Sequence, residues 1–342
     1  MTSASCVAVT SSPPSQEMAA DSALPGVVER LHAELSPDST GEVATYIPEL
    51  GKANPDHFGI AVVTTGGDTI VAGDADVEFT MQSISKAFTY CLLLDEAGRE
   101  AVASIVGVQP SSEPFSAVEL NPRTNRPFNP MLNAGAIAIS ACLREMLGPG
   151  AFDYVLQVLG RAAGRELQLD ERVFRSELET GHRNRAIGHL LRNAGLFGID
   201  VDAALELYFR QCSVLVSARD VATMGATLAN IGTHPSTQAE VFGVSAVRDT
   251  LSVMFTCGMY DGAGDWACRV GLPAKSGVAG GVLAVVNRQL GIGTFSPRVD
   301  AVGNSVRGLK ACIGLAEELG LHAFDCMNVG SSIVGSMLSG PR

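Results

Sequence analysis

The sequence predicts a mixed α and β fold in which one sheet is built from both ends of the chain, with a block of helices inserted between them. Apolar stretches typical of strands occur near both ends, within 58–72 and 281–295. Between them, apolar residues recur at helical spacing. We therefore expect a sheet covered by the terminal helices, with a cleft between that sheet and the inserted helical domain.

The N-terminal part supplies the first half of the predicted sheet. Residues 1–25 are rich in Ser, Ala and Pro and have no positively charged start, so we expect a disordered tail rather than a signal peptide. Helical spacing follows over 27–35. Strands are then predicted at 58–63 and 69–72, joined by a turn at Gly66-Gly67.

The middle and the C-terminal part complete the predicted fold. Helices are predicted at 83–97, 134–147, 153–163, 183–193, 203–212, 218–230 and 244–256, and this block looks all-α. Strands return at 281–286 and 291–295, before a last helix at about 304–319. We expect one catalytic domain over 26–340, with a sheet subdomain (26–82 and 262–340) and a helical subdomain (83–261).

Composition narrows the classes of function. The chain has 342 residues, 46% of them hydrophobic, and a net charge of -12. Such a charge argues against binding nucleic acid or a membrane surface and favours a small-molecule substrate. No apolar run reaches the roughly 18 residues of a membrane span. Eight cysteines are scattered without a C-x-x-C pair, which predicts reduced core residues in a cytoplasmic protein and no zinc site.

The low number of lysines is the first observation that points to a particular chemistry. Only four lysines occur among 24 basic residues, and one of them stands in the motif Ser83-Ile84-Ser85-Lys86 at a predicted helix start. A spacing of three places the Ser83 hydroxyl and the Lys86 amine on one helix face, where a desolvated lysine can act as a base. The motif alone is weak, because an N-cap serine followed by a solvent-facing lysine would look the same.

A second lysine stands in Lys275-Ser276-Gly277, just before a predicted strand. Penicillin-recognising enzymes pair Ser-x-x-Lys with a Lys-Thr/Ser-Gly strand in this order, so the two motifs together are more specific than either alone. Their third motif, Ser-Asp-Asn, is absent from this sequence. The alternative is a surface lysine at the start of a strand.

Several polar residues lie between these two motifs, and each has an ordinary structural alternative. Asn133 follows a Pro-Met turn and could be a helix N-cap. Glu177 could lie on a solvated helix face, and Tyr208 could be a core aromatic. The segment 108–128, rich in proline and serine, could be either a lid over a site or a surface connection.

Longer motifs resemble the serine-dependent glutaminase family, which implies a β-lactamase/transpeptidase-like fold. The resemblance runs from about residue 27 to 335 and rests on ordered motifs at 46–50, 82–86, 129–137, 176–177 with Asn184, 257–261 and 272–281. One departure from the family pattern is His182, which stands where we expect Asp.

The resemblance implies hydrolysis of L-glutamine to L-glutamate and ammonia through an acyl-enzyme. It implies Ser83 as nucleophile, Lys86 as base and Tyr260 as proton relay, with the N–H groups of Ser83 and Val278 binding the oxyanion. It also implies that the substrate is bound by Asn133, Glu177, Asn184, Tyr208 and Tyr260. Tyr46 would cover the site, and the residues that would support it are Gln82, Lys275 and Ser276. The resemblance implies no cofactor or metal. It implies assembly as a homodimer or homotetramer.

Two other functions fit part of the pattern. A penicillin-recognising hydrolase or an esterase would use the same Ser-Lys chemistry, and the missing Ser-Asp-Asn motif argues against it. A binding module that kept the fold without catalysis would retain the motifs but turn over no substrate. Ammonia release from glutamine, compared with turnover of a β-lactam or ester, separates the three.

Overall fold

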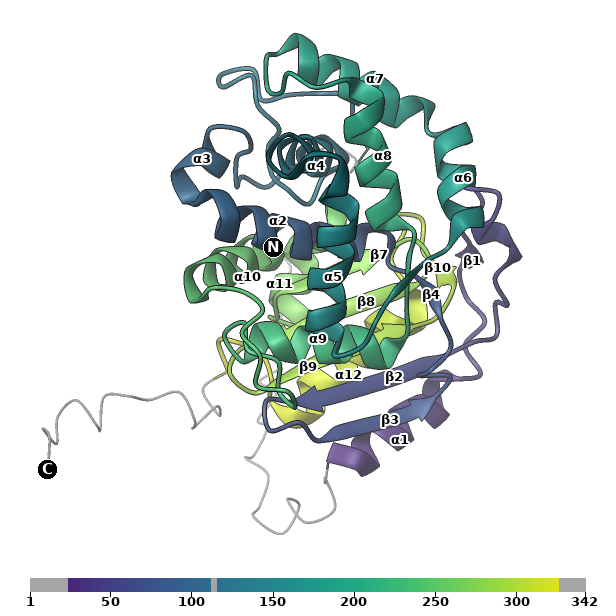
Figure 1. Cartoon of the computed structure of the whole chain (residues 1–342). Helices are drawn as coiled ribbons and strands as arrows, with labels where there is room; N and C mark the ends of the chain where they lie inside the picture. The colour runs from purple at the N-terminus through teal and green to yellow at the C-terminus, as the bar shows by residue number, and fades with distance from the viewer. Residues whose placement is uncertain (1–23, 112–115, 326–342) are drawn as a thin grey trace, which may run out of the picture.

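The computed structural model describes residues 24–111 and 116–325 and is organised around a five-stranded antiparallel sheet (Figure 1). Strands from both ends of the chain join in this sheet, as the sequence predicts, with the two N-terminal strands beside the three C-terminal ones. Their order is β3 (Thr69–Gly73), β2 (Gly59–Thr64), β9 (Leu290–Phe295), β8 (Gly281–Val286) and β7 (Ala274–Gly277).

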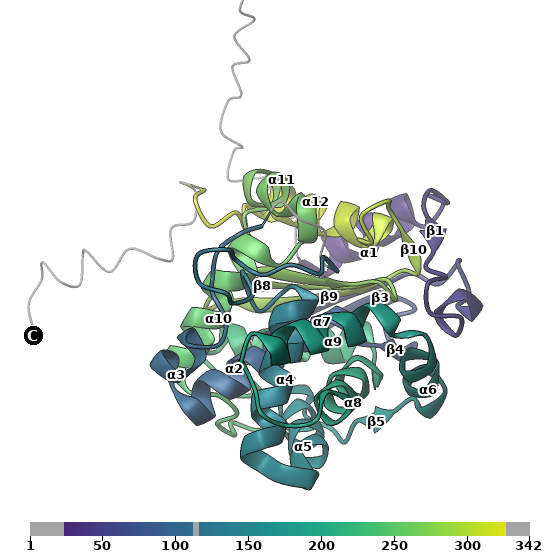
Figure 2. The same ribbon diagram turned by 90° about the horizontal axis from the view of Figure 1, so that it is seen from above.

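The central strands are buried on both faces because alternate side chains enter two different cores. In β2, Ala61 and Val63 face a large core shared with the helical block. Ile60 and Val62 face a smaller core beneath α1 (Leu24–Leu35) and α12 (Val306–Leu319). Figure 2 shows this layering, with α1 and α12 on one face of the sheet and α9 (Ala218–Ala229) on the other.

The inserted block is predominantly helical and packs beside the sheet (Figure 1). Its helices are α2 (Ser85–Ala97), α3 (Arg99–Ala103), α4 (Asn133–Leu147), α5 (Ala151–Ala163), α6 (Glu171–Thr180), α7 (His182–Asn193), α8 (Val201–Cys212), α10 (Val244–Cys257) and α11 (Ala263–Arg269), together with α9. All seven helices predicted in this block are present, each within about two residues of the predicted bounds. The first predicted helix, 83–97, differs at its start, where a short 3₁₀ helix precedes α2.

Three parts of the structure differ from the sequence prediction. The helical block contains two short strands, β5 (Gln168–Leu169) and β6 (Val214–Val216), which form a second sheet with β4 (Phe79–Thr80). Strands this short carry no readable alternation. The helices α3, α6 and α11 were not predicted, and α1 begins at Leu24, inside the predicted tail. The rest of the tail, 1–23, lies outside the described residues, as do Cys6, Cys326 and residues 112–115.

The remaining elements of the described residues are two short strands and four 3₁₀ helices. The strand β1 (Glu42–Val43) pairs with β10 (Arg298–Val299), which ties the N-terminal loop to the segment before α12. The 3₁₀ helices are η2 (Leu50–Lys52), η3 (Gln82–Ile84), η4 (Gly148–Gly150) and η5 (Tyr260–Gly262). Two of these, η3 and η5, carry candidate site residues.

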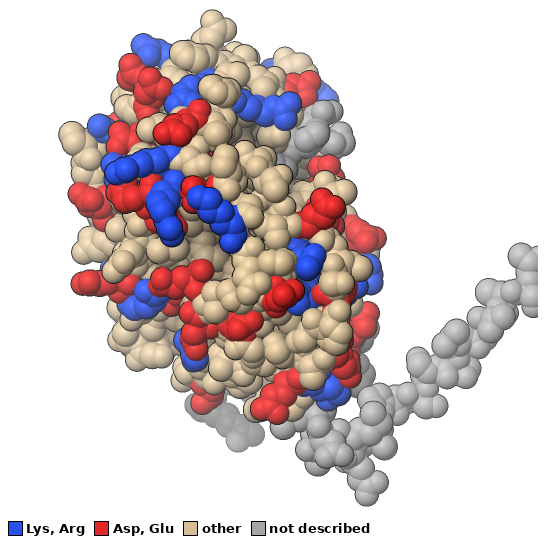
Figure 3. Space-filling view, turned by 90° about the vertical axis from the view of Figure 1, so that its right-hand side faces the viewer, with Lys and Arg blue, Asp and Glu red and all other residues tan. Residues whose placement is uncertain are grey.

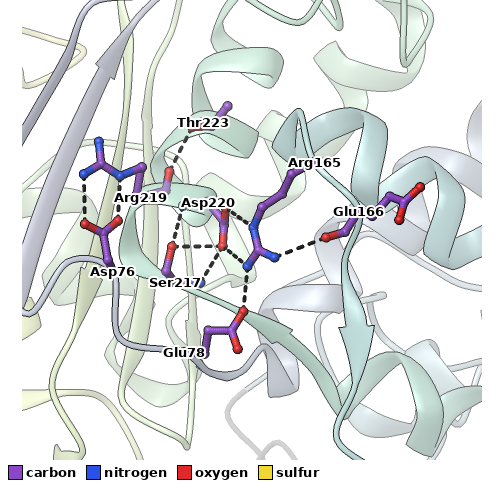
Figure 4. Close-up of polar contacts among 8 residues, drawn as sticks. All are labelled: Asp76, Glu78, Arg165, Glu166, Ser217, Arg219, Asp220 and Thr223. Atoms are coloured by element: carbon purple, nitrogen blue, oxygen red, sulfur yellow. Dashed lines mark hydrogen bonds and ion pairs between the residues drawn. The ribbon is translucent and has the colours of Figure 1, made fainter.

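An ion-pair network joins the helical block to α9 and to the segment that leads into β4 (Figure 4). Arg165, between α5 and β5, binds both oxygens of Asp220 at 2.9 and 2.7 Å and Glu78 at 2.9 Å. Asp220 also forms a capping box with Ser217 at the start of α9. The Asp220 side chain is 7% exposed and that of Arg165 is 39% exposed, so this pair is only partly screened by solvent.

Replacing Arg165 with methionine should lower the free energy of unfolding by about 1–2 kcal/mol, because the buried Asp220 carboxylate loses its bidentate partner. Denaturant titration measures the change. The matched control is Arg172→Met, since the Arg172 side chain is 81% exposed and its nitrogen lies 3.8 Å from Asp170. Equal losses in both variants would contradict the role of the network.

The surface charges, the helix lengths and the cysteines can be compared with the expectations from composition. Figure 3 shows basic and acidic side chains interspersed on one face of the molecule. Within the described ranges, no helix is both long enough and apolar enough to cross a bilayer. Six described cysteines are free, and all of them except Cys268 are buried, so five of the six are core residues.

Candidate active site

The candidate nucleophile lies where the small sheet leads into the central helix. Strand β4 ends at Thr80, η3 follows with Ser83 at its centre, and Lys86 is the second residue of α2. The N-cap of α2 is Ile84, so Ser83 is not the capping serine that the alternative interpretation required. Ser83 is 7% exposed and Lys86 is fully buried, which excludes a solvent-facing lysine.

The Lys86 amine is held between two side chains. Its Nζ lies 2.9 Å from Ser83 Oγ and 2.7 Å from Asn133 Oδ1. Burial lowers the pKa of Lys86 to about 8, while the nearby groups Cys212 and Glu177 act in the opposite direction. A lysine with this pKa is neutral in a useful fraction of molecules near neutral pH and can accept the serine proton.

Asn133 connects this pair to α7. It is the first residue of α4, whose N-cap is Leu132, so its side chain is not used as a cap. The Asn133 Nδ2 donates to Asn184 Oδ1 at 2.9 Å. The departure noted in the sequence, His182, is the exposed first residue of α7.

Glu177 supplies a buried carboxyl group on α6. It is 5% exposed, so it does not lie on a solvated face. Burial raises the pKa of Glu177 to about 7, and this rise is opposed by a hydrogen bond with the side chain of Gln82 and by the charge of Lys86. Gln82 Nε2 also lies 3.3 Å from Thr80 Oγ1, so Gln82 links η3 to Glu177.

Two tyrosines complete this side of the site. Tyr208 on α8 is buried, and its hydroxyl hydrogen-bonds with the thiol of Cys212. Burial raises the pKa of Tyr208 well above its ordinary value. Tyr46, in the N-terminal loop, is 56% exposed as a residue, yet desolvation of its hydroxyl and the charge of Glu177 raise its pKa well above the ordinary value.

Tyr260, in η5, is a third tyrosine at the site and contacts Ser83. Its backbone has a φ of 53°, an uncommon conformation for a residue with a side chain. The Tyr260 hydroxyl donates to the Ser276 carbonyl at 3.2 Å and also hydrogen-bonds with Ser83. Burial raises the pKa of Tyr260 to about 12, so the phenol keeps its proton near neutral pH.

Strand β7 brings the second lysine motif to the same place. Lys275 is fully buried, which excludes the surface lysine of the alternative interpretation. Its Nζ lies 2.8 Å from the Ser276 carbonyl and 4.1 Å from the centre of the Tyr260 ring. Burial, with a smaller contribution from Lys86, lowers the pKa of Lys275 well below its ordinary value.

The end of β7 passes very close to η3. A Cβ at Gly277 would lie 2.8 Å from the Met81 carbonyl oxygen, so only glycine permits this approach. The next residue, Val278, is 4% exposed. Among the backbone hydrogen bonds that the described residues form in turns, loops and caps, none uses the Val278 N–H, so this group is available as a donor.

The fold thus brings the predicted residues together from segments that are far apart in the sequence. Three residues that were not predicted from the sequence hydrogen-bond with the side chains of predicted site residues. Thr80 contacts Gln82, Cys212 contacts Tyr208, and Asn304 contacts Ser276. None of the three carries a motif signal of its own. The described part of segment 108–128 contributes Pro110 and Ser111 to a cavity of about 460 Å³ that Tyr260 also lines, so this segment borders the site.

Comparison with known proteins identifies the family. The family model described as Glutaminase matches residues 41–324. The chain is 55% identical over 291 residues to Glutaminase 2 of Bradyrhizobium diazoefficiens, covering 85% of this chain and 46% of that protein. It is 48% identical over 305 residues to the glutaminase of Nostoc sp., covering 89% of this chain and 91% of that protein. The chain thus spans about half of the first relative and nearly all of the second.

Solved structures agree with the sequence comparisons. The structure of Mglu in its glutamate form has a TM-score of 0.83 and 41% identity, covering 91% of this chain and 71% of that one. A probable glutaminase of Bacillus subtilis has a TM-score of 0.79 and 33% identity, covering 86% and 96%. These structural neighbours share the β-lactamase-like fold, which confirms the predicted fold class. The chain therefore belongs to the glutaminase family and is an enzyme that hydrolyses glutamine.

Proposed function

We propose that this chain converts L-glutamine to L-glutamate and ammonia through an ester formed on Ser83. The carrying observation is the 2.9 Å contact between Ser83 Oγ and the buried Nζ of Lys86. A serine hydroxyl is a weak nucleophile until an adjacent base accepts its proton. The low pKa of Lys86 equips it for that task.

In the first half-reaction, Ser83 Oγ bonds to the side-chain carboxamide carbon while its proton passes to Lys86 Nζ. Collapse of the tetrahedral intermediate breaks the C–N bond, and the leaving nitrogen takes up a proton and departs as ammonia. Tyr260 is suited to relay this proton, because its hydroxyl hydrogen-bonds with Ser83 and its high pKa keeps it protonated.

In the second half-reaction, water attacks the ester carbon and gives up a proton to the base. The ester C–O bond then breaks, glutamate leaves and Ser83 regains its proton. Both tetrahedral intermediates carry an oxyanion, and the N–H groups of Ser83 and Val278 are its proposed donors. The close approach of Gly277 to η3 and the unused Val278 N–H support this assignment.

The other end of glutamine carries an ammonium and a carboxylate. We assign the ammonium to Glu177, whose carboxyl group is buried with few competing donors. Asn133, Asn184 and Tyr208 supply neutral polar groups on the same side of Ser83, and Tyr46 covers the opening. Mglu has been solved in its glutamate form, which supports a pocket of this kind in the fold. Polar groups left unpaired would disfavour amides without an amino-acid head.

The test is to trap the acyl-enzyme. Rapid acid quenching of enzyme mixed with glutamine, followed by peptide mass spectrometry, should show a γ-glutamyl group on Ser83. A β-lactam and a p-nitrophenyl ester serve as control substrates and should be turned over far more slowly. If the enzyme hydrolyses glutamine but the γ-glutamyl group is found on another residue, the assignment of Ser83 is wrong.

The KM for glutamine should rise as the pH falls below about 7. The pKa of Glu177 is raised to about 7, so acid protonates the carboxylate that binds the substrate ammonium. Between pH 7 and 6 the rise should be about fivefold, and at lower pH it should approach tenfold per pH unit, the limit for one required ionisation. Steady-state kinetics at constant ionic strength measure it. In Glu177→Gln, the KM should be high throughout this range, and a pH response identical to that of wild type would contradict the role.

Two further expectations concern the protein as a whole. We propose a homodimer or homotetramer, as the family resemblance implies, which light scattering at micromolar concentration would measure. We also propose a cytoplasmic location, which the free buried cysteines of the described residues favour.

A further inference from the structure

We infer that the turn between β10 and α12, residues 300–304, is a positioning element for the reaction, and that Asn304 is its principal residue. The inference rests on the proposed role of Tyr260. Nothing in the sequence motifs assigns a task to this turn. In the structure it contacts the two groups that border Ser83 on the sheet side, Tyr260 and Val278.

Asn304 acts through Ser276. Its Oδ1 accepts a hydrogen bond from Ser276 Oγ at 2.5 Å, and both residues are buried, at 3% and 0% exposed. The carbonyl of the same Ser276 accepts hydrogen bonds from Tyr260 Oη at 3.2 Å and from Lys275 Nζ at 2.8 Å. Ser276 is therefore fixed by Asn304 on one side and holds Tyr260 on the other.

The turn also lies beside Val278, whose N–H is a proposed donor to the oxyanion. Gly303 has a φ of 96°, a conformation that favours glycine. A Cβ placed on it would lie 3.2 Å from Val278 Cγ1 and 3.9 Å from Tyr260 Cε2. Gly303 thus lies next to both side chains, and a larger residue at this position would press on Val278.

The turn is rigid enough for this task because its own backbone is closed by four hydrogen bonds. Asp300 Oδ1 accepts from the N–H groups of Val302 and Asn304, at 3.0 and 2.9 Å. The backbone N–H of Asp300 donates to the Asn304 carbonyl at 2.8 Å, and that of Gly303 donates to the Asp300 carbonyl at 3.1 Å. Asn304 therefore presents its side chain to Ser276 from a fixed backbone.

The consequence for catalysis is selective. Loss of the Asn304 acceptor frees the Ser276 hydroxyl and loosens the carbonyl that orients the Tyr260 phenol. Proton relay depends on the alignment of that phenol, and a displacement of about 1 Å can cost about 10²-fold in rate. The groups assigned to the substrate head, Glu177 and Asn184, are carried by α6 and α7 and not by the turn, β7 or η5, so the effect on kcat should exceed the effect on KM.

The test compares four variants of the whole chain by steady-state kinetics with glutamine. Asn304→Leu should lower kcat by about 10- to 10²-fold with KM within about twofold of wild type. Asn304→Asp retains an oxygen acceptor and should recover most of the lost kcat. Gly303→Ala, which strains the turn and presses on Val278, should lower kcat in the same way as Asn304→Leu. Asn230→Ala, which removes a turn hydrogen bond to the Thr233 carbonyl far along the chain, is the control.

A double-mutant cycle separates positioning from simple loss of stability. If Asn304 acts through Tyr260, Asn304→Leu should cost little further kcat in a Tyr260→Phe background. Equal losses in both backgrounds, an unchanged kcat in Asn304→Leu, or failure of Asn304→Asp to recover activity while folded would overturn the inference. Wild-type activity of Tyr260→Phe would instead overturn the proposed role of Tyr260 itself. Thermal unfolding of each variant confirms that folded protein is compared.

Discussion

Replacing Ser83 with alanine should lower kcat for glutamine by about 10⁴-fold or more and leave no γ-glutamyl adduct on the protein. The reason is geometric as well as chemical. Ser83 Oγ is the oxygen in contact with Lys86 Nζ, at 2.9 Å, and an alanine at this position leaves Lys86 without an O–H to deprotonate. Ammonia release under saturating glutamine measures the loss.

The matched control is Ser252→Ala. Ser252 is an exposed serine on α10 whose hydroxyl donates to the Arg248 carbonyl at 2.8 Å, so its loss should leave kcat unchanged. Binding of glutamate to Ser83→Ala, followed by calorimetry, shows whether the pocket is intact. Residual activity within tenfold of wild type in a folded Ser83→Ala protein would mean that the acyl-enzyme does not form on this residue.

Replacing Lys86 with methionine should lower kcat by about 10³- to 10⁴-fold, in the range expected for loss of a general base. Lys86→Arg should be equally inactive, because a guanidinium keeps its proton in proteins and cannot act as the base. In the wild-type enzyme, kcat should rise with pH and level off above about 8. The neutral amine is the active form, and burial lowers the pKa of Lys86 to about 8.

The pH dependence provides the decisive comparison. Between pH 8 and 7 the wild-type kcat should fall about fivefold, and further below it should fall about tenfold per pH unit, because the fraction of neutral amine decreases by those factors. This slope should be absent from the residual activity of Lys86→Met. Lys310→Met, which removes an exposed lysine paired with Asp38, should retain both kcat and the slope. Full activity of Lys86→Arg at pH 7 would contradict the assignment.

Much of the fold could be predicted because long apolar patterns report directly on burial. The strand β8 matches the predicted range, and α4 begins one residue before its prediction. The short strands β5 and β6 could not be predicted, because two or three residues hold no periodicity and pair only once the helical block has packed. The start of α1 within the predicted tail shows that composition alone does not mark a helix boundary.

The candidate site shows the same division. Ser83, Lys86 and Lys275 could be identified from local motifs, since a spacing of three on a helix and a Lys-Ser-Gly strand have meaning before the chain folds. Asn133, Glu177, Asn184 and Tyr208 followed only from the resemblance to glutaminases. Neither a local motif nor the resemblance to glutaminases pointed to Asn304 or Cys212, because each acts through a contact that forms only in the folded chain.

The sequence on its own carries the fold class, the Ser83–Lys86 pair and the family, because each depends on local spacing or on ordered motifs along the chain. Tertiary structure decides the chemical state of these groups. Lys86 acquires its low pKa by being fully buried against α4 and α8, and Glu177 acquires its high pKa in the same way. The support of Tyr260 by Ser276 and Asn304 also exists only in the folded chain. Burial and long-range contact depend on how distant segments pack, and no local pattern encodes them.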